Sequence, residues 1–141
     1  MFEIKRGILT SEQFNGLTES VGWGHRIIEQ VESALKNSLY TVCIKEGDKI
    51  IAMARMIGDN SMSYFIKDVV VIPEYQGKGV GKLIISDILS YIKERTPKDW
   101  KVSVELMSAY GKEAFYEKFG FQKRPSTNYT NYGAGMFLTV N

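Results

Sequence analysis

The feature that most constrains this fold is an apolar run, Val69–Ile72, followed directly by Pro73 and a glycine-rich turn. Four consecutive β-branched residues favour a strand that is covered on both faces. Proline ends such a strand because it has no amide proton to give to a sheet ladder. Beyond the turn, apolar residues recur three or four positions apart, which predicts a helix ending before Pro97. The rest of the chain must therefore be arranged around a central strand, a turn and a long helix.

The remaining pattern predicts a mixed α+β fold. Alternating or β-branched segments indicate strands, and apolar residues at helical spacing indicate helices. In the second helix, four apolar residues are expected on one buried stripe: Ile27, Ile28, Val31 and Leu35. The expected strands cover 2–8, 39–45, 50–57, 62–72, 100–107, 121–123 and 133–140, and the expected helices cover 10–21, 25–36, 80–96 and 109–119.

Length and composition narrow the class of protein. A chain of 141 residues fits one domain, 1–141, with a sizeable core. The 18 basic and 16 acidic residues are interleaved, so no basic stripe suggests a nucleic-acid partner. The sole cysteine, Cys43, lies in an apolar run, which indicates a buried thiol and neither an internal disulfide nor a metal site. No apolar stretch has the length of a membrane span or a signal segment, so we expect a cytoplasmic protein with no membrane partner.

The glycines at 77, 79 and 81 leave two interpretations open. A helix N-terminus with glycines can hold phosphate oxygens, and the same glycines can serve a tight turn or close helix packing. A Walker loop would need Ser or Thr at position 83, where this chain has Leu83. A dinucleotide-binding fold would need an early parallel βαβ unit followed by an acidic residue, and neither is found.

Two segments carry a family resemblance. The stretch 68–81 resembles the acetyl-CoA signature of the GCN5-related N-acetyltransferase (GNAT) superfamily, Arg/Gln-x-x-Gly-x-Gly/Ala, through Gln76, Gly79 and Gly81. The stretch 114–121 looks like the Tyr-x-Lys-x-Gly-Phe segment of the same family. The resemblance, to small bacterial-type members, implies a mostly antiparallel sheet of about seven strands flanked by about four helices. It also implies an enzyme that transfers acetyl from acetyl-CoA to a primary amine, with no metal.

The resemblance also implies roles in holding acetyl-CoA. Backbone amides of the glycine turn would bind the pyrophosphate, two lysines would add charge, and Val70 and Ile72 would offer main-chain hydrogen bonds to the pantetheine arm. The Val70 amide would also polarise the thioester carbonyl. Many relatives have Asn where this chain has Ala109, so that cofactor contact is absent or supplied otherwise. The implied cofactor residues are Val70, Val71, Ile72, Gln76, Gly77, Lys78, Gly79, Val80, Gly81 and Lys82.

Tyr116 and Asp68 are the expected catalytic residues. By its place in the motif, Tyr116 is the candidate general acid for the departing thiolate, and its alternative role is that of a core aromatic. Asp68 is the candidate base or water-positioning group. Its alternative role is that of a carboxylate paired with Lys67 or Arg55. Glu105 is a second candidate base, on the polar side of its strand, where a surface carboxylate is the competing interpretation.

The acceptor is not specified by the sequence. Three aromatic residues are candidates to line its pocket: Trp23, in a segment resembling small bacterial family members, Tyr64 and Tyr132. For each of them a place in the core is an equal alternative. His25 is interpreted as structural or exposed. We expect a small-molecule or peptide amine as acceptor and a homodimer formed through the last strand. The alternatives are a non-catalytic acyl-CoA-binding sensor or scaffold, and a phosphate-binding module unrelated to CoA.

Overall fold

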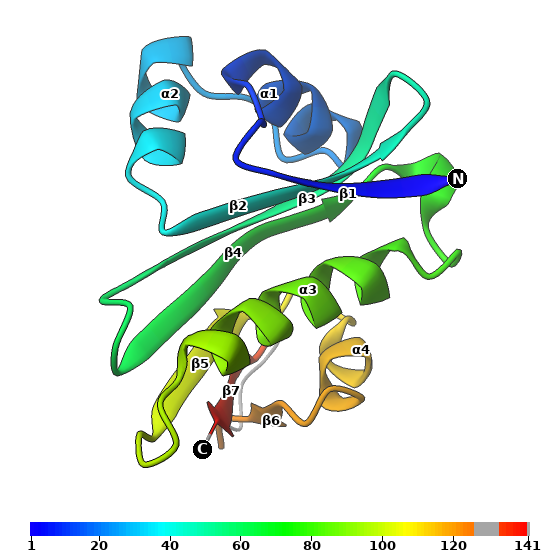
Figure 1. Ribbon diagram of the computed structural model, residues 1–141. Coiled ribbons are helices and arrows are strands. Elements are labelled where there is room, and N and C mark those ends of the chain that lie inside the picture. The colour runs from blue at the N-terminus through cyan, green and yellow to red at the C-terminus, as the bar shows by residue number, and fades with distance from the viewer. Residues whose placement is uncertain (126–132, 141) are drawn as a thin grey trace.

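The computed structural model describes residues 1–125 and 133–140, which form one seven-stranded sheet with four α-helices (Figure 1). The strand order is β1-β2-β3-β4-β5-β7-β6, and every neighbouring pair is antiparallel except β4 and β5. The strands are β1 Phe2–Arg6, β2 Tyr40–Glu46, β3 Lys49–Gly58, β4 Ser63–Val71, β5 Val102–Met107, β6 Gln122–Lys123 and β7 Gly135–Val140. The helices are α1 Ser11–Ser20, α2 Ile28–Lys36, α3 Val80–Arg95 and α4 Glu113–Glu117, with a 3-10 turn at Pro73–Tyr75. This is the mixed, mostly antiparallel fold that the sequence predicts.

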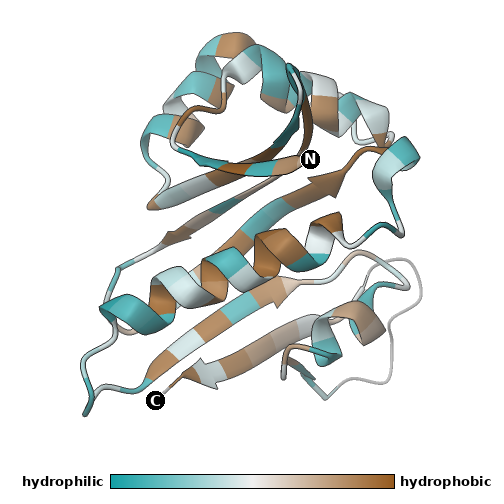
Figure 2. Cartoon of the chain, turned by 45° about the vertical axis from the view of Figure 1, so that its right-hand side comes forward, coloured by the Kyte–Doolittle hydropathy of each residue, from teal (hydrophilic) through white to brown (hydrophobic). Residues whose placement is uncertain are grey.

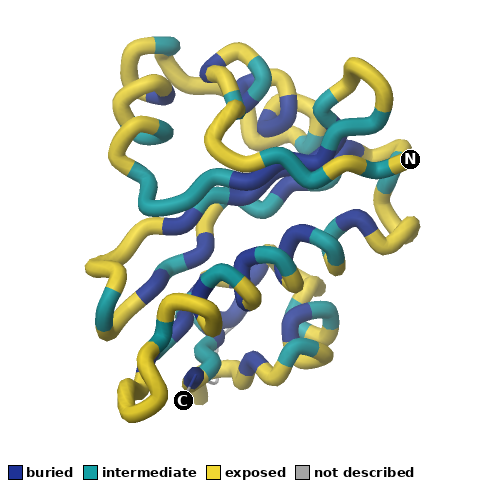
Figure 3. The backbone as a smooth tube through the Cα atoms, viewed as in Figure 1, coloured by how far each residue is buried: buried dark blue, intermediate teal, exposed yellow. Residues whose placement is uncertain are grey.

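The apolar run of β4 lies at the centre of this sheet, as predicted from its continuous β-branched residues. Helices α1 and α2 cover one face of β1–β4, and α3 covers the other (Figure 1). Figure 2 shows brown apolar positions recurring along α3, and Figure 3 shows buried residues gathered along the central strands. Ile84, Ile88 and Ile92, one helical stripe of α3, are fully buried. Val70 is 2% exposed, and β4 contacts both α1 and α3, so it packs against both layers.

The residues directly before α1 and α3 differ in how they satisfy the first amides of each helix. Thr10 precedes α1, and its hydroxyl accepts from the Gln13 amide at 3.1 Å while the Gln13 side chain accepts from the Thr10 amide at 3.0 Å. This reciprocal pair is the predicted capping box. Helix α3 has no side-chain cap, because its N-cap residue is Gly79, which has no side chain and has φ +82°. Its first amides are consequently left for another acceptor.

The predicted bounds of two helices were wrong. Helix α2 begins at Ile28, so Ile27 precedes the helix and is 71% exposed instead of lying on the buried stripe. Helix α4 covers only Glu113–Glu117, because residues 109–112 form a turn containing Gly111 at φ +83°. The last strand, β7, lies between β5 and β6 within the sheet. No helix in the described part of the chain is long and apolar enough to cross a membrane.

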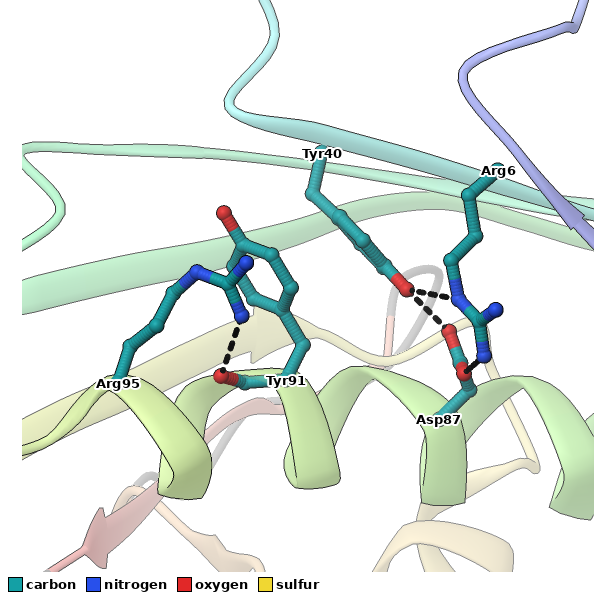
Figure 4. A network of polar contacts seen from close by, with 5 residues as sticks. All are labelled: Arg6, Tyr40, Asp87, Tyr91 and Arg95. Atoms are coloured by element: carbon teal, nitrogen blue, oxygen red, sulfur yellow. Dashed lines mark hydrogen bonds and ion pairs between the residues drawn. The ribbon is translucent and has the colours of Figure 1, made fainter.

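A polar cluster ties the first strand to α3 (Figure 4). Arg6 and Tyr40 both contact the carboxylate of Asp87, whose side chain is 7% exposed. The Arg6 Nε atom also donates to the Tyr40 hydroxyl at 2.8 Å. Tyr91 stacks on Tyr40 with ring centroids 4.1 Å apart, and the Arg95 guanidinium lies 3.6 Å from the Tyr91 ring. We call these five residues the β1–α3 clamp.

Candidate functional site

The parallel pairing of β4 and β5 is short. Ser63–Ile66 pairs with Ser103–Leu106, and the register ends there. β4 continues to Val71 without a partner in β5. Among the described residues, the edge of β4 that faces β5 is therefore open over its last residues, and main-chain groups on that edge are available to a ligand.

A β-bulge lies at the point where β4 leaves β5. In the pairing with β3, Met53 is opposite Val70 and Arg55 is opposite Lys67. Asp68 and Val69 thus stand opposite the single residue Ala54, which is the arrangement of a bulge. Asp68 has φ +54°, in the left-handed region that side chains other than Asn and Asp seldom adopt.

The directions of the main-chain groups along β4 differ from the expected set of hydrogen-bond donors to the cofactor. The Ile72 amide already donates to the Ile51 carbonyl at 3.0 Å, so it is not available to a cofactor. Hydrogen-bonded pairs alternate along an antiparallel ladder. The main-chain N–H and C=O groups of Val70 therefore also point at β3, and those of Val71 point at the open edge. The Val71 carbonyl accepts from the Gln76 side chain at 2.9 Å. Val71 is thus the one of the three that can offer its amide to a ligand.

The glycine turn presents open space and unpaired amides. Gly77 and Gly79 have φ +77° and +82°, and no atom lies within 4 Å of where a Cβ would stand on either. The first intrahelical bond of α3 joins the Leu83 amide to the Gly79 carbonyl, so the amides of residues 80–82 have no acceptor inside the helix. The Gln76 amide donates to Pro73 at 3.3 Å, which removes it from the expected set. Unpaired amides at the positive end of a helix fit a phosphate group.

Other residues of the turn have different surroundings. A Cβ on Gly81 would lie 3.2 Å from the Phe115 ring, so this glycine allows α3 to pack closely on α4. Lys78 is exposed, with its ammonium 5.1 Å from the Tyr75 ring centroid. Lys82 is also exposed. The packing interpretation therefore applies to Gly81, and the phosphate-binding interpretation applies to Gly77 and Gly79.

A cavity of about 180 Å³ lies beside the bulge. It brings together three residues that the sequence singles out from distant segments: Trp23, Asp68 and Tyr116. The same cavity is also lined by residues that no motif indicates. The full lining is Trp23, Phe65, Ile66, Lys67, Asp68, Val69, Leu106, Met107, Ala109 and Tyr116. The alternation of side chains along β4 and along β5 was the only sequence signal that could have suggested Phe65 and Met107. That alternation does not indicate which end of the strands forms a site.

Tyr116 is buried but its hydroxyl is not engaged. The residue is 7% exposed, and its ring meets Phe115 and Phe121 edge-on at centroid distances of 5.0 and 6.1 Å. No residue among 1–125 and 133–140 forms a hydrogen bond with its hydroxyl. Burial raises the pKa of Tyr116 to about 12. The phenol is therefore protonated at neutral pH and can donate to a group in the cavity.

Asp68 forms the ion pair that the sequence left open. Its Oδ2 atom accepts from Arg55 Nε at 2.6 Å, and the two side chains are 16% and 17% exposed. Glu105 instead lies near the surface, 3.1 Å from Arg124, with a side chain 36% exposed. Of the two carboxylates, only Asp68 lines the cavity.

Other expected residues lie away from this cavity. Tyr64 is buried on β4 and donates its hydroxyl to Asn60 Oδ1 at 2.9 Å, so its predicted place in the acceptor pocket is not supported. His25 Nδ1 lies 2.8 Å from Glu19 Oε1 on an exposed surface. Tyr132 falls outside the described residues.

Comparisons with known proteins agree with this architecture. Residues 36–123 match the sequence profile of the acetyltransferase (GNAT) domain. The chain is 32% identical over 113 residues to the uncharacterised N-acetyltransferase ycf52 of Pyropia yezoensis, and 35% identical over 116 residues to a ycf52-like protein of Prochlorococcus marinus. These matches cover 77% and 79% of this chain and 63% and 62% of the relatives, so the chain spans about three fifths of their length.

Solved structures give the same result. A protein of methicillin-resistant Staphylococcus aureus, described as a probable acetyltransferase, has a TM-score of 0.81 and 32% identity, over 94% of this chain and 100% of that one. A GNAT family protein of Streptococcus pneumoniae has a TM-score of 0.73 and 28% identity, over 93% and 98%. With the profile match over more than half of its length, the chain belongs to the GNAT acetyltransferase family.

Proposed function

We propose that this protein is an acetyl-CoA-dependent N-acetyltransferase that acts on a primary amine. The observation that carries the proposal is the cavity at the end of the β4–β5 pairing, where the protonated phenol of Tyr116 lies beside the open edge of β4. Family membership supports the reaction class. An aminoglycoside 6'-N-acetyltransferase with the same fold, TM-score 0.72 at 14% identity, is described in complex with coenzyme A.

The residues present fit acetyl-CoA. The unpaired amides of residues 77–82 at the start of α3 would hold the pyrophosphate, with Lys78 and Lys82 adding positive charge. The main-chain N–H of Val71, on the open edge of β4, would donate to a carbonyl oxygen of the pantetheine arm. Together these contacts would direct the thioester end toward the cavity. When bound, acetyl-CoA supplies an activated acyl group.

The chain's own groups account for the remaining chemistry. An alkylammonium has a pKa of about 10, so the acceptor must lose a proton to solvent before its neutral amine attacks. Trp23 and Phe65 would hold the body of the amine against apolar surface. An amide on the open edge of β4 would stabilise the charge on the carbonyl oxygen. Tyr116 would donate its proton to the departing sulfur.

The decisive experiment pairs binding with turnover. Calorimetric titration with acetyl-CoA is expected to show micromolar binding, and pooled primary amines are expected to release free thiol. Binding without release for any amine would favour the non-catalytic sensor or scaffold. Absence of binding would contradict the proposal and revive the phosphate-binding alternative. Homodimerisation stays a prediction, which a monomeric mass in light scattering would contradict.

A further inference from the structure

The bulge in β4 holds a residue with a side chain in an unfavourable conformation. Asp68, with φ +54°, and Asn60 are the residues other than glycine that have positive φ in the described part of the chain. The left-handed conformation costs free energy for a residue with a Cβ, although Asp and Asn bear it better than most. Such strain persists only where surrounding contacts hold it. The contacts of Asp68 therefore show what maintains the bulge.

Those contacts come from Arg55 on β3. Arg55 Nε donates to Asp68 Oδ2 at 2.6 Å, and Arg55 Nη1 donates to Ser38 Oγ at 3.4 Å. The Ser38 hydroxyl in turn donates to the Ala34 carbonyl at 2.7 Å, which ties the guanidinium to the end of α2. The pair is sheltered, with both side chains less than a fifth exposed. A planar guanidinium held at two points fixes the direction of the carboxylate that it binds.

We propose that Arg55 is a positioning residue that holds Asp68 in its left-handed conformation and so maintains the β4 bulge. Asp68 then contributes to acetyl transfer through backbone geometry and not as a proton acceptor. The inference rests on the proposed acetyltransferase function and names two residues that shape its site.

The position of the bulge explains why it matters. It directly precedes Val70–Ile72, and it lies where the pairing of β4 with β5 has just ended. Main-chain and side-chain directions alternate along a strand, so losing the extra residue would turn each following residue to the other side. Val71 would then face β3 instead of the open edge. The bulge thus decides which groups of β4 can meet a ligand.

Substitutions at Asp68 separate geometry from proton transfer. Asp68→Asn keeps an acceptor for Arg55 and tolerates the left-handed conformation, and Asp68→Gly adopts that conformation without any contact. Neither variant has a carboxylate. We expect both to keep kcat/KM within about threefold of the parent, and Asp68→Ala and Arg55→Met to lower it about tenfold or more.

Two further readouts sharpen the test. The double variant Arg55→Met with Asp68→Gly should match Asp68→Gly alone, because glycine no longer needs the arginine. The pH profile of the Asn and Gly variants should follow that of the parent. Glu3→Gln is the matched control, since Glu3 is an exposed carboxylate 3.4 Å from Lys5 at the far edge of the sheet. Circular dichroism and thermal melts report whether each variant is folded.

The outcomes are distinct. Asn and Gly variants that fold and bind acetyl-CoA but are as inactive as the Ala variant would show that the carboxylate itself acts, and would overturn the inference. Full activity of Asp68→Ala would overturn it as well. A parent protein that acetylates no amine would contradict the proposed function instead. The same series is then compared by acetyl-CoA affinity, which should fall for Asp68→Ala and Arg55→Met only.

Discussion

Removing the phenolic oxygen of Tyr116 isolates its proposed chemical role. The change Tyr116→Phe keeps the ring contacts with Phe115 and Phe121. The lost hydroxyl has no hydrogen-bond partner among the described residues, so the free energy of unfolding should change by less than about 1 kcal/mol. The affinity for acetyl-CoA should also be unchanged, because the phosphate-binding amides lie in the glycine turn. Any large effect therefore belongs to the chemical step.

The size of that effect follows from the acidities involved. Loss of a positioned general acid commonly costs a factor of about 10²–10⁴. A thiol has a pKa near ~8.5, so a thiolate leaves without full protonation more readily than an alkoxide would. A phenol with a pKa of about 12 is also a weak acid toward it. Both considerations favour the lower limit of this range or slightly less, so kcat should fall about 30- to 100-fold, or about 2–3 kcal/mol of barrier.

The assay is thiol release with a saturating acceptor, run against Tyr110→Phe as a control. Tyr110 is 68% exposed in the turn before α4, and the control should behave as the parent. Because burial raises the pKa of Tyr116 to about 12, the parent rate should rise with pH as the amine deprotonates and should not decline below about pH 11. A Tyr116→Phe enzyme within twofold of the parent would refute the general-acid argument, as would selective loss of acetyl-CoA binding.

Three further outcomes are expected. Gly79→Ala should weaken acetyl-CoA binding measured by calorimetry and lower stability by about 1–2 kcal/mol, since φ +82° is strained for alanine although no atom blocks its Cβ. Asp87→Ala should lower the free energy of unfolding in urea by about 1–3 kcal/mol, because it leaves Arg6 and Tyr40 without their buried acceptor. Above pH 10 the unfolded state loses the Tyr116 proton while the folded state keeps it to about pH 12, so stability should fall by up to about 3 kcal/mol across that window, and less in Tyr116→Phe.

Sequence reasoning succeeded where one physical requirement acts on consecutive residues. Val69–Ile72 is central in the sheet because a run without polar residues needs cover on both faces. Helix α3 ends at Arg95, as Pro97 requires, and the Thr10 capping box starts α1. Tyr116 and Asp68 also line one cavity, although they are 48 positions apart in the sequence. Motif order was enough to bring them together.

Sequence reasoning failed where a residue's role depends on the direction in which its main chain or side chain points. Val70 and Ile72 were expected to offer their main chain to the cofactor, but the bond from Ile72 to Ile51 turns both toward β3. Nothing local predicts the bulge at Asp68, since its left-handed backbone depends on Arg55, which is 13 residues away in the sequence. Tyr64 was placed in the pocket by its residue type alone, but it lies near the start of β4, where its hydroxyl donates to Asn60.

The place of β7 in the sheet has a consequence for synthesis of the chain. Gly135–Val140 fills the position between β5 and β6, and in the described part of the chain β6 pairs with β7 alone. Until residues 135–140 have been made and have left the ribosome, β5 has one unpaired edge and no local segment to cover it. Exposed edges of this kind recruit other strands, so a chain released without β7 is more prone to aggregate than the chain that includes it. Pulse-labelled chains truncated at residue 125 should accordingly associate with chaperones for longer than chains that include β7.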